Sequence, residues 1–298
     1  MFERQHWLTQ QVSDEKINLS NNVCYDQILQ NQVLFLLGRN NITFSQYEDE
    51  SKVYKILSEF YGINPENIAI GFGLGELIPR IFSIFKDKKF SIVTPTWMMA
   101  TGFCNVQNID YVEGIDYSSQ VLYIANPNGM TGKYTRLEEL EEYSKKFEYV
   151  IVDESYNDFC DHNCSMVPHS LTKTNIIATK TFSKSLALPG LRFGYCFSSK
   201  SIIKKIQDIR PSGSVNSIVG KIGRELLNLK DEHISRMIIT RNYIENHYEC
   251  EKSHSNFVLL KNKEKFLDYF NYRKIGNLYR ISLTDLVTFK HYETISNL

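Results

Sequence analysis

The chain has 298 residues, of which 42% are hydrophobic and 23% are charged, which is enough for a sizeable core in one or two domains. Lys plus Arg and Asp plus Glu both number 34, so the formal net charge is zero. This balance gives no electrostatic reason to expect a nucleic acid or an anionic membrane as a partner.

The chain begins with Met1 to Trp7, where no apolar run follows a basic start, so we expect no secretory signal. The most apolar stretch, 68–85, contains Glu76 and Arg80 and therefore predicts a strand followed by a helix, not a membrane span. The 6 cysteines show no spacing typical of a disulfide framework. These features together favour a cytoplasmic enzyme with reduced thiols.

Short apolar runs alternate with amphipathic segments along the first two thirds of the chain. A helix is predicted at 53–60, with Gly62 as its stop, and Thr135 with Glu138 predicts a capping box at the start of another helix. This alternation predicts an α/β fold with a mostly parallel sheet covered by helices on both faces. The predicted strands are 68–70, 90–93, 121–125, 149–152, 176–179 and 192–197.

The pattern changes after residue 218. Helices around 218–229 and 231–247 precede two apolar runs, 257–260 and 279–283, which favours a smaller α+β unit. We therefore expect a large domain at 40–210 and a small C-terminal domain at 211–298. The N-terminal segment, 1–39, is expected to pack with the small domain.

Polar and glycine-rich segments follow the predicted strands at the points where the strands end. Because the carboxyl ends of parallel strands meet at one edge of a sheet, these groups should form a single site. The site offers an amine, a carboxylate, an indole and a phosphate-binding set of glycines, hydroxyls and an arginine. Such a set suits a flat, electron-poor ring that forms a Schiff base with a lysine. The groups are Gly73, Leu74, Gly75, Trp97, Asn128, Asp153, Tyr156, Thr181, Ser183, Lys184 and Arg192.

These residues resemble the fold-type I enzymes that use pyridoxal 5′-phosphate (PLP), specifically the class I and II aminotransferases. Within that family the chain resembles histidinol-phosphate aminotransferases and threonine-phosphate decarboxylases. The resemblance extends from Leu19 to Ser282 and rests on Thr181-Phe182-Ser183-Lys184, on 190–194 and on 153–156. It implies PLP as the cofactor, an amino-acid substrate and a homodimer.

The resemblance also implies roles around the cofactor ring. Lys184 would bind the cofactor covalently and move protons as a general acid and base. Asp153 would pair with the ring nitrogen and Tyr156 with the 3′ oxygen, while Trp97 would stack on the ring.

Other residues would hold the acidic groups. The cofactor phosphate would be bound by Gly73, Leu74, Gly75, Thr181, Ser183 and Arg192, and by Tyr47 reaching across from the partner subunit. Arg280 would clamp a substrate carboxylate with two parallel hydrogen bonds, and Asn22 would contact the substrate.

One segment departs from the family pattern. The family usually has Asn-Pro-Asn-Asn-Pro-Thr-Gly, whereas this chain has 126–132 reading Asn-Pro-Asn-Gly-Met-Thr-Gly. The asparagine that normally contacts the 3′ oxygen of the ring aligns with Gly129. Either Asn128 takes over this contact or the contact is missing, which would change the pKa of the imine. The segment between Phe257 and Arg280 is also shorter than the family usually has.

Other interpretations remain beside the aminotransferase. The same lysine and aspartate would serve a decarboxylase acting on an amino acid, with the arginine holding another group such as a phosphate. A PLP-binding regulator without catalysis is a third hypothesis. Glycines 71, 73 and 75 do not match the spacing of a dinucleotide-binding loop. Cys160 and Cys164 with His162 suggest a metal site, but no second ligand pair lies nearby in the sequence, so we expect no metal.

Overall fold

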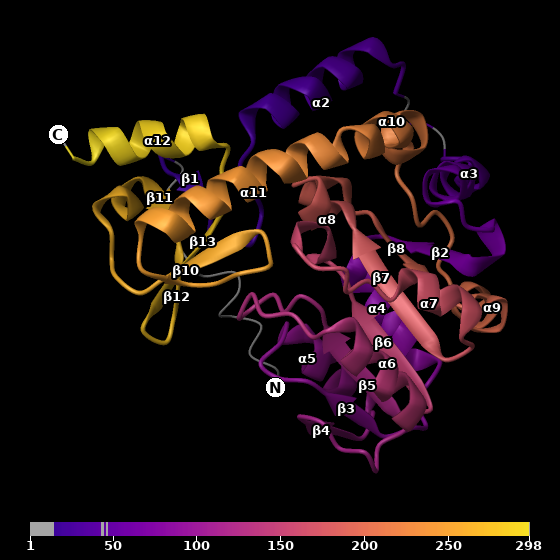
Figure 1. The fold of residues 1–298 in the computed structure, drawn as a ribbon. Coiled ribbons are helices and arrows are strands. Elements are labelled where there is room, and N and C mark those ends of the chain that lie inside the picture. Colours follow the sequence, from indigo (N-terminus) through magenta and orange to yellow (C-terminus); the bar gives the residue numbers. More distant parts are fainter. Residues whose placement is uncertain (1–14, 43–44, 46, 298) are drawn as a thin grey trace.

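The structure is a computed structural model that describes residues 15–42, 45 and 47–297. The start of the chain, on which the expectation about a secretory signal rests, lies outside the described residues, as does 1–14 of the N-terminal segment. Figure 1 shows a large α/β region beside a smaller region that the C-terminal residues form. None of the helices in the described ranges is long and apolar enough to cross a membrane.

The large region is built on a seven-stranded sheet with the strand order β2-β8-β7-β6-β5-β3-β4. The strands from β4 to β7 pair in parallel, while β8 is antiparallel to both of its neighbours. The mostly parallel sheet is therefore as predicted. The strands are β2 (Ile68–Gly71), β3 (Phe90–Ile92), β4 (Tyr111–Glu113), β5 (Val121–Ala125), β6 (Tyr149–Asp153), β7 (Ile176–Thr181) and β8 (Gly194–Phe197).

Both faces of this sheet are covered, because successive side chains of its strands enter two different clusters. Tyr123 and Ile151 pack with helices α4, α5 and α9, whereas Leu122 and Val150 pack with α6. The helices of this region are α3 (Glu50–Tyr61), α4 (Leu74–Ser83), α5 (Met99–Gln107), α6 (Leu137–Lys146), α7 (Val167–Thr172), α8 (Phe182–Ser185) and α9 (Lys200–Asp208). Short 3₁₀ turns lie at Pro65–Asn67, Asn157–Phe159 and Pro189–Leu191.

The predicted capping box at the start of α6 is wrong. The residue that caps the helix is Arg136, whose side chain makes no capping hydrogen bond. Thr135 is held instead by Asn126, which accepts from its N–H at 2.7 Å and donates to its carbonyl oxygen at 3.1 Å. Thr135 is therefore bound within the loop after β5 and does not cap the helix.

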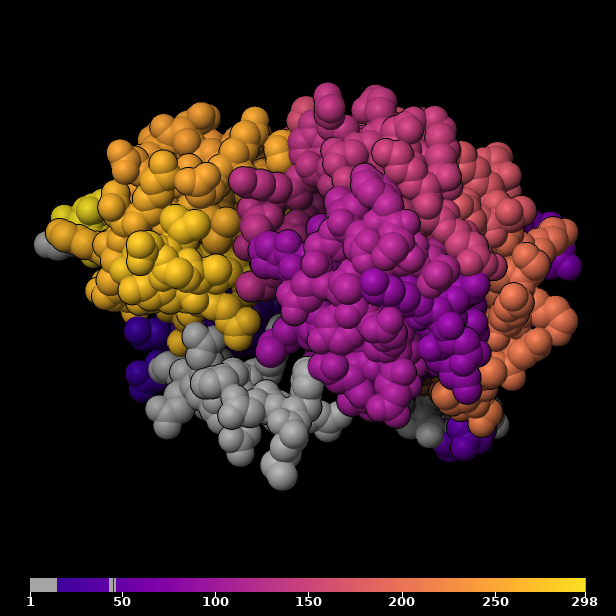
Figure 2. Space-filling view, turned by 90° about the horizontal axis from the view of Figure 1, so that it is seen from below, coloured from indigo at the N-terminus to yellow at the C-terminus, as the bar shows by residue number. Residues whose placement is uncertain are grey.

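The C-terminal part contains two long helices and a four-stranded antiparallel sheet with the order β12-β13-β10-β9. Its helices are α10 (Ser217–Asn228), α11 (Lys230–His247) and α12 (Leu286–Ile295), and a 3₁₀ turn spans Lys265–Tyr269. Its strands are β9 (Cys250–Glu251), β10 (Phe257–Leu260), β11 (Phe270–Asn271), β12 (Arg273–Ile275) and β13 (Leu278–Ser282). Figure 2 shows these orange and yellow residues side by side with the magenta residues of the large region.

The N-terminal residues run along the C-terminal part. Strand β1 (Ile17–Asn18) pairs in parallel with β11, and the N–H of Tyr25 donates to the carbonyl oxygen of Leu283 at 2.9 Å. Helix α2 (Gln27–Arg39) then packs on α10. These contacts support the proposed packing of the N-terminal segment with the small domain, and we retain the boundary near residue 210 as a proposal.

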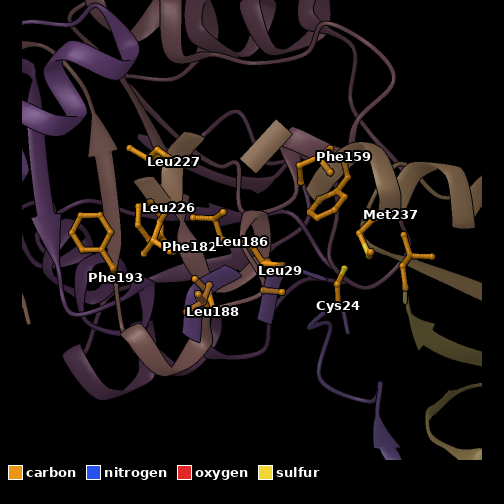
Figure 3. Packing of buried hydrophobic residues seen from close by; sticks show 14 of the residues in the cluster. Cys24, Leu29, Phe159, Phe182, Leu186, Leu188, Phe193, Leu226, Leu227 and Met237 are labelled. Carbon is orange, nitrogen blue, oxygen red and sulfur yellow. The ribbon is translucent and has the colours of Figure 1, made fainter. Parts of the chain in front are cut away.

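The largest buried cluster joins these parts behind the short helix α8, which carries Lys184. It takes in apolar side chains of the N-terminal segment, of α8 and the residues after it, and of α10 and α11. Figure 3 shows part of this cluster and labels Cys24, Leu29, Phe159, Phe182, Leu186, Leu188, Phe193, Leu226, Leu227 and Met237. Because packed interiors are dense, this cluster fixes α8 in one position.

Asp26 connects α2 to α11 at a fully buried position. Its carboxylate caps α2 by accepting from the N–H groups of Ile28 and Leu29 at 3.1 Å. It also lies 2.7 Å from Nδ1 of His233 and accepts from Arg236 at 2.8 Å. Burial alone would raise its pKa, but the hydrogen bonds from His233 and Arg236 outweigh burial and lower the pKa to about 2.

Replacing Asp26 with alanine should destabilise the protein by about 3 kcal/mol at neutral pH, because the buried His233 and the partly buried Arg236 lose their partner. Since the pKa is lowered in the folded state, the contribution is present above about pH 4 and is lost as the pH falls toward 2. Urea unfolding at several pH values measures this difference. As a control, Asp231→Ala removes a side chain that is 88% exposed and should change stability by less than about 1 kcal/mol. Equal effects of the two substitutions would contradict the prediction.

Candidate active site

A cavity of about 360 Å³ lies where β5, β6 and β7 end, between the large sheet and the C-terminal part. Most of the residues that the sequence placed in one site do line it. They are Asn22, Leu74, Gly75, Trp97, Asp153, Tyr156, Thr181, Ser183, Lys184, Arg192 and Arg280. The volume is in the range of small-molecule sites in enzymes.

Lys184 lies on the short helix α8, which begins directly after β7 with Thr181 as its cap. Its Nζ atom donates to the carbonyl oxygen of Asn21 at 3.0 Å and has no carboxylate partner among the residues described. Burial of the ammonium, helped by the nearby charge of Arg280, lowers the pKa of Lys184 to about 8. About a tenth of the amine is therefore neutral and nucleophilic at pH 7, far more than for an ordinary lysine.

The pKa of Lys180, which lies on β7, is shifted in the opposite direction from that of Lys184. Its burial alone would lower its pKa, but the carboxylates of Asp158 and Glu154 outweigh that effect and raise it. The Nζ atom of Lys180 lies 3.4 Å from Asp158 and 3.6 Å from Glu154. Lys180 is thus a structural cation, whereas Lys184 is the lysine that can act as a nucleophile.

Asp153 ends β6 and its carboxylate is held by hydroxyl and N–H donors. Tyr123 donates to Oδ2 at 3.0 Å, and Ser155 donates to Oδ1 from its backbone N–H at 3.0 Å and from its hydroxyl at 2.6 Å. The carboxylate forms no ion pair with a Lys or Arg in the described part of the chain. A buried, fixed carboxylate without a cationic partner suits a ligand that carries a positive charge, such as a protonated ring nitrogen.

The opposite end of the cavity suits a phosphate. Leu74 and Gly75 form the first turn of α4, whose N–H groups and helix dipole favour an anion. Arg192 approaches from the neighbouring loop so closely that a Cβ atom at Gly73 would lie 2.6 Å from its Nη2 atom. Gly73 has a φ of 75°, which a glycine adopts easily, and it caps α4 without lining the cavity itself. The hydroxyls of Thr181 and Ser183 complete this side.

Arg280 lies on β13 and is buried, with only 3% of its surface exposed. Its guanidinium donates to the carbonyl oxygens of Gly129 and Ser20, each at 3.2 Å, and forms no ion pair with any acidic residue that the structure describes. Burial, together with the charge of Arg273, lowers its pKa to about 10. A buried arginine facing a cavity without an acidic partner is a binding group for an anionic ligand.

Besides Gly73, two predicted residues do not line the cavity. Asn128 does not line the cavity, because its side chain is used in the loop: it donates to the carbonyl oxygen of Pro95 at 2.6 Å and accepts from the N–H of Met130 at 2.8 Å. The structure therefore does not support the expected cofactor contact of Asn128. Tyr47 is 93% exposed and also lies outside the cavity of its own chain.

The model of the family described as aminotransferase class I and II matches residues 14–254 of this chain. The chain belongs to the class I and II aminotransferases. A histidinol-phosphate aminotransferase of Pyrococcus furiosus is 28% identical over 269 residues, which cover 82% of this chain and 76% of that one.

Two solved structures share the fold of this aminotransferase. The L-threonine-O-3-phosphate decarboxylase of Porphyromonas gingivalis has a TM-score of 0.75 at 16% identity, covering 94% of this chain and 98% of the other. The histidinol-phosphate aminotransferase of Sinorhizobium meliloti, solved in complex with pyridoxal 5′-phosphate, has a TM-score of 0.74 at 17% identity, with coverages of 98% and 91%.

The cofactor of this aminotransferase is PLP, and the cavity fits it on three independent points. A lysine with a lowered pKa, a buried carboxylate without a cationic partner and an anion-binding helix N-terminus with an arginine all face one space. Lys184, Asp153 and Arg192 are accordingly the residues that would hold the amine-reactive carbon, the ring nitrogen and the phosphate.

The aminotransferase cavity is also lined by Arg273, which sequence reasoning missed. Arg273 lies on β12 opposite Arg280 in a hairpin whose strands pair from Ile275 with Leu278 outward. The two residues between Ile275 and Leu278 are Gly276, with a φ of 57°, and Asn277. A two-residue turn that contains glycine is a hairpin signal, and its register alone would have placed Arg273 beside Arg280.

The cysteines considered as metal ligands lie in the loop after β6. The Sγ atoms of Cys160 and Cys164 are 3.2 Å apart, and His162 stacks on Tyr134 with ring centroids 4.5 Å apart. In the described ranges of the chain, no group of three or more His, Cys, Asp or Glu side chains is placed to hold a metal ion.

Proposed function

We propose that this aminotransferase acts on an amino donor with a strongly acidic group, such as a phosphorylated amine of the histidinol-phosphate kind, and on a keto acid as acceptor. The observation that carries this proposal is the buried guanidinium of Arg280, which donates to the carbonyl oxygens of Gly129 and Ser20 and to Sδ of Met130 but to no carboxylate of the described residues. Arg273 adds a second positive charge to the same cavity. The names of the relatives that bind phosphorylated substrates support the same class.

In this proposal each residue around the cofactor has a separate role in the reaction. PLP supplies an electron-poor ring that accepts the electron pair of a bond broken at the substrate α carbon. Asp153 fixes a negative charge at the end of the cavity where the ring nitrogen would lie, which favours a proton on that nitrogen. Lys184 accepts a proton from the α carbon of the substrate and returns it to another atom, a role for which its pKa, lowered to about 8, is suited. Arg280 orients the substrate through its acidic group.

The rate at which cofactor-free protein binds PLP covalently should depend on pH through Lys184. Because only the neutral amine attacks, the rate should rise about tenfold per pH unit below the pKa of about 8 and level off above it. The growth of the visible absorption band after mixing, followed from pH 6 to pH 10, measures this rate. A profile that keeps rising to pH 10 would show that the lysine is not perturbed.

Replacing Arg280 with glutamine should raise the KM for an acidic donor about 10- to 100-fold, because a hydrogen-bonded charge contact is lost. A panel of phosphorylated and unphosphorylated amino donors, each with a keto acid, identifies the substrate class by steady-state kinetics. Arg136→Gln, a change at an exposed arginine without a side-chain cap bond, is the matched control and should leave KM unchanged. An unchanged KM in Arg280→Gln would refute the proposed binding role.

A decarboxylase is the second candidate, because the solved threonine-phosphate decarboxylase has the same fold and because two arginines could hold a phosphate instead of a carboxylate. The substrate carboxylate would then stand free of Arg280. Product analysis separates the two reactions: an aminotransferase forms a keto product, whereas a decarboxylase releases CO₂.

We further propose a homodimer in the cytoplasm, in which Tyr47 contacts the cofactor phosphate of the other subunit. The high exposure of Tyr47 in the single chain and the free thiols in the structure support this. Mixing Tyr47→Phe with Lys184→Ala protein tests the sharing of residues, since only a mixed dimer would restore one intact site. Gel filtration of an active monomer would remove Tyr47 from the site.

A further inference from the structure

The space beside Gly129 is filled by the ring of Tyr156. A Cβ atom at position 129 would lie 2.6 Å from Cε2 and 3.1 Å from the hydroxyl oxygen of Tyr156. A side chain at this position is therefore incompatible with the observed place of the ring. Glycine at 129 therefore allows the observed position of Tyr156, and residue 129 itself cannot supply an amide to the Tyr156 hydroxyl.

Asn22 provides that amide from the N-terminal segment. Its Nδ2 atom donates to the hydroxyl oxygen of Tyr156 at 3.1 Å and to the carbonyl oxygen of Gly129 at 2.9 Å. The Gly129 carbonyl fixes the orientation of the amide, because a rotated amide would place its oxygen against another acceptor. The backbone carbonyl of Asn22 in turn accepts from Asn256 at 2.9 Å.

The hydrogen bond from Asn22 determines what the Tyr156 hydroxyl can do. Since the hydroxyl oxygen accepts from Asn22, its own proton is available to another acceptor, and no residue in the described ranges takes it. Burial raises the pKa of Tyr156 to about 12, while the bond from Asn22 and the charge of Arg280 act in the opposite direction. The phenol therefore stays protonated and is a donor to a ligand in the cavity.

We propose that Asn22 is a positioning residue that holds the Tyr156 hydroxyl with its proton directed at the cofactor ring oxygen, in place of the side chain that Gly129 lacks. This inference rests on the proposed role of Tyr156 as a cofactor contact. It differs from both sequence-based alternatives, since neither Asn128 nor an absent contact is required. It also assigns a function to the N-terminal segment, which supplies both Asn22 and the Asn21 carbonyl that accepts from Lys184.

Two variants remove the amide donor in different ways. Asn22 has a φ of 52°, so Asn22→Gly deletes the side chain without straining the backbone, whereas Asn22→Asp keeps its size and replaces the donor with an acceptor. The matched control is Asn31→Asp, the same chemical change at an exposed residue of α2. Circular dichroism and thermal unfolding identify any variant that does not fold.

The readouts are the dissociation constant of PLP from the protein and the pH midpoint of the visible band of bound PLP. Both Asn22 variants should bind PLP about 2- to 10-fold more weakly, as expected for one hydrogen bond. The pH midpoint of the visible band should rise by up to about one pH unit in both variants. A weaker hydrogen bond from the Tyr156 hydroxyl to the ring oxygen favours the protonated form of the bound cofactor. In a Tyr156→Phe background, Asn22→Gly should have less than about a twofold further effect, since the two residues act through one contact.

Two results would overturn this inference. Unchanged binding and midpoint in both folded Asn22 variants would show that the amide is not used. An effect of Asn22→Gly that persists in full in the Tyr156→Phe background would show that Asn22 does not act through Tyr156. If the unaltered protein binds PLP with a visible band but these results appear, only the inference fails. If it binds no PLP at all, the proposed function fails as well.

Discussion

Replacing Lys184 with alanine should lower turnover by at least about 10³-fold. The substitution removes both the nucleophile that binds the cofactor and the group that moves protons at the substrate, and proton transfer by a positioned side chain alone contributes about 10²- to 10⁴-fold. The lowered pKa of about 8 and the absence of a carboxylate partner among the described residues suit Lys184 for both tasks. Steady-state assays, together with the loss of the visible band, measure the effect.

The matched control for this substitution is Lys200→Ala. Lys200 is exposed and pairs with Glu66 at the surface, so its loss should leave turnover within about twofold. Small amines added in solution should restore part of the activity of Lys184→Ala, because they replace the missing base. Full turnover of Lys184→Ala without added amine would rule out the mechanism.

Replacing Asp153 with asparagine should lower turnover about 10²- to 10³-fold while leaving covalent binding of the cofactor intact. The substitution keeps the shape of the side chain but removes the fixed negative charge, and a preorganised charge of this kind contributes about that much. The donors from Tyr123 and Ser155 hold the carboxylate in place, so its effect is electrostatic and does not depend on movement.

Comparison of kcat with cofactor content measures this effect, since a loss confined to kcat separates it from poor loading. Asp208→Asn is the control, because Asp208 is exposed and pairs with Lys204 at the surface. Turnover of Asp153→Asn within threefold of the unaltered enzyme would show that the ring nitrogen needs no charge partner.

The central strands were predictable because burial on both faces leaves a continuous apolar run. Strand β5 has the predicted bounds, Val121–Ala125, and every one of its side chains is buried. The edge strand β4, Tyr111–Glu113, was missed because it has only 3 residues and is partly exposed. Helix α12 (Leu286–Ile295) was also missed, since only one of its residues, Phe289, is buried.

The site was predictable where a residue follows a strand directly, as Asp153 and Lys184 do. It was less predictable where backbone conformation or a distant partner decides the position. Arg192 was expected to begin a strand, but its φ of 48° is left-handed, and the strand begins at Gly194. Asn128 was expected in the cavity, but the local demand for donors and acceptors in its turn engages its amide. Neither effect leaves a signal in composition or periodicity.

The pairing of β1 with β11 joins the two ends of the described chain, and this has a consequence for synthesis on the ribosome. Ile17 and Asn18 are translated long before their partners, Phe270 and Asn271. Until then Asn21 and Asn22 have no fixed place beside Lys184 and Tyr156, and Arg280 does not yet exist. Nascent chains should therefore acquire a complete cofactor site only after Arg280 has emerged, and a ribosome stalled before that residue should carry a protein that cannot retain PLP.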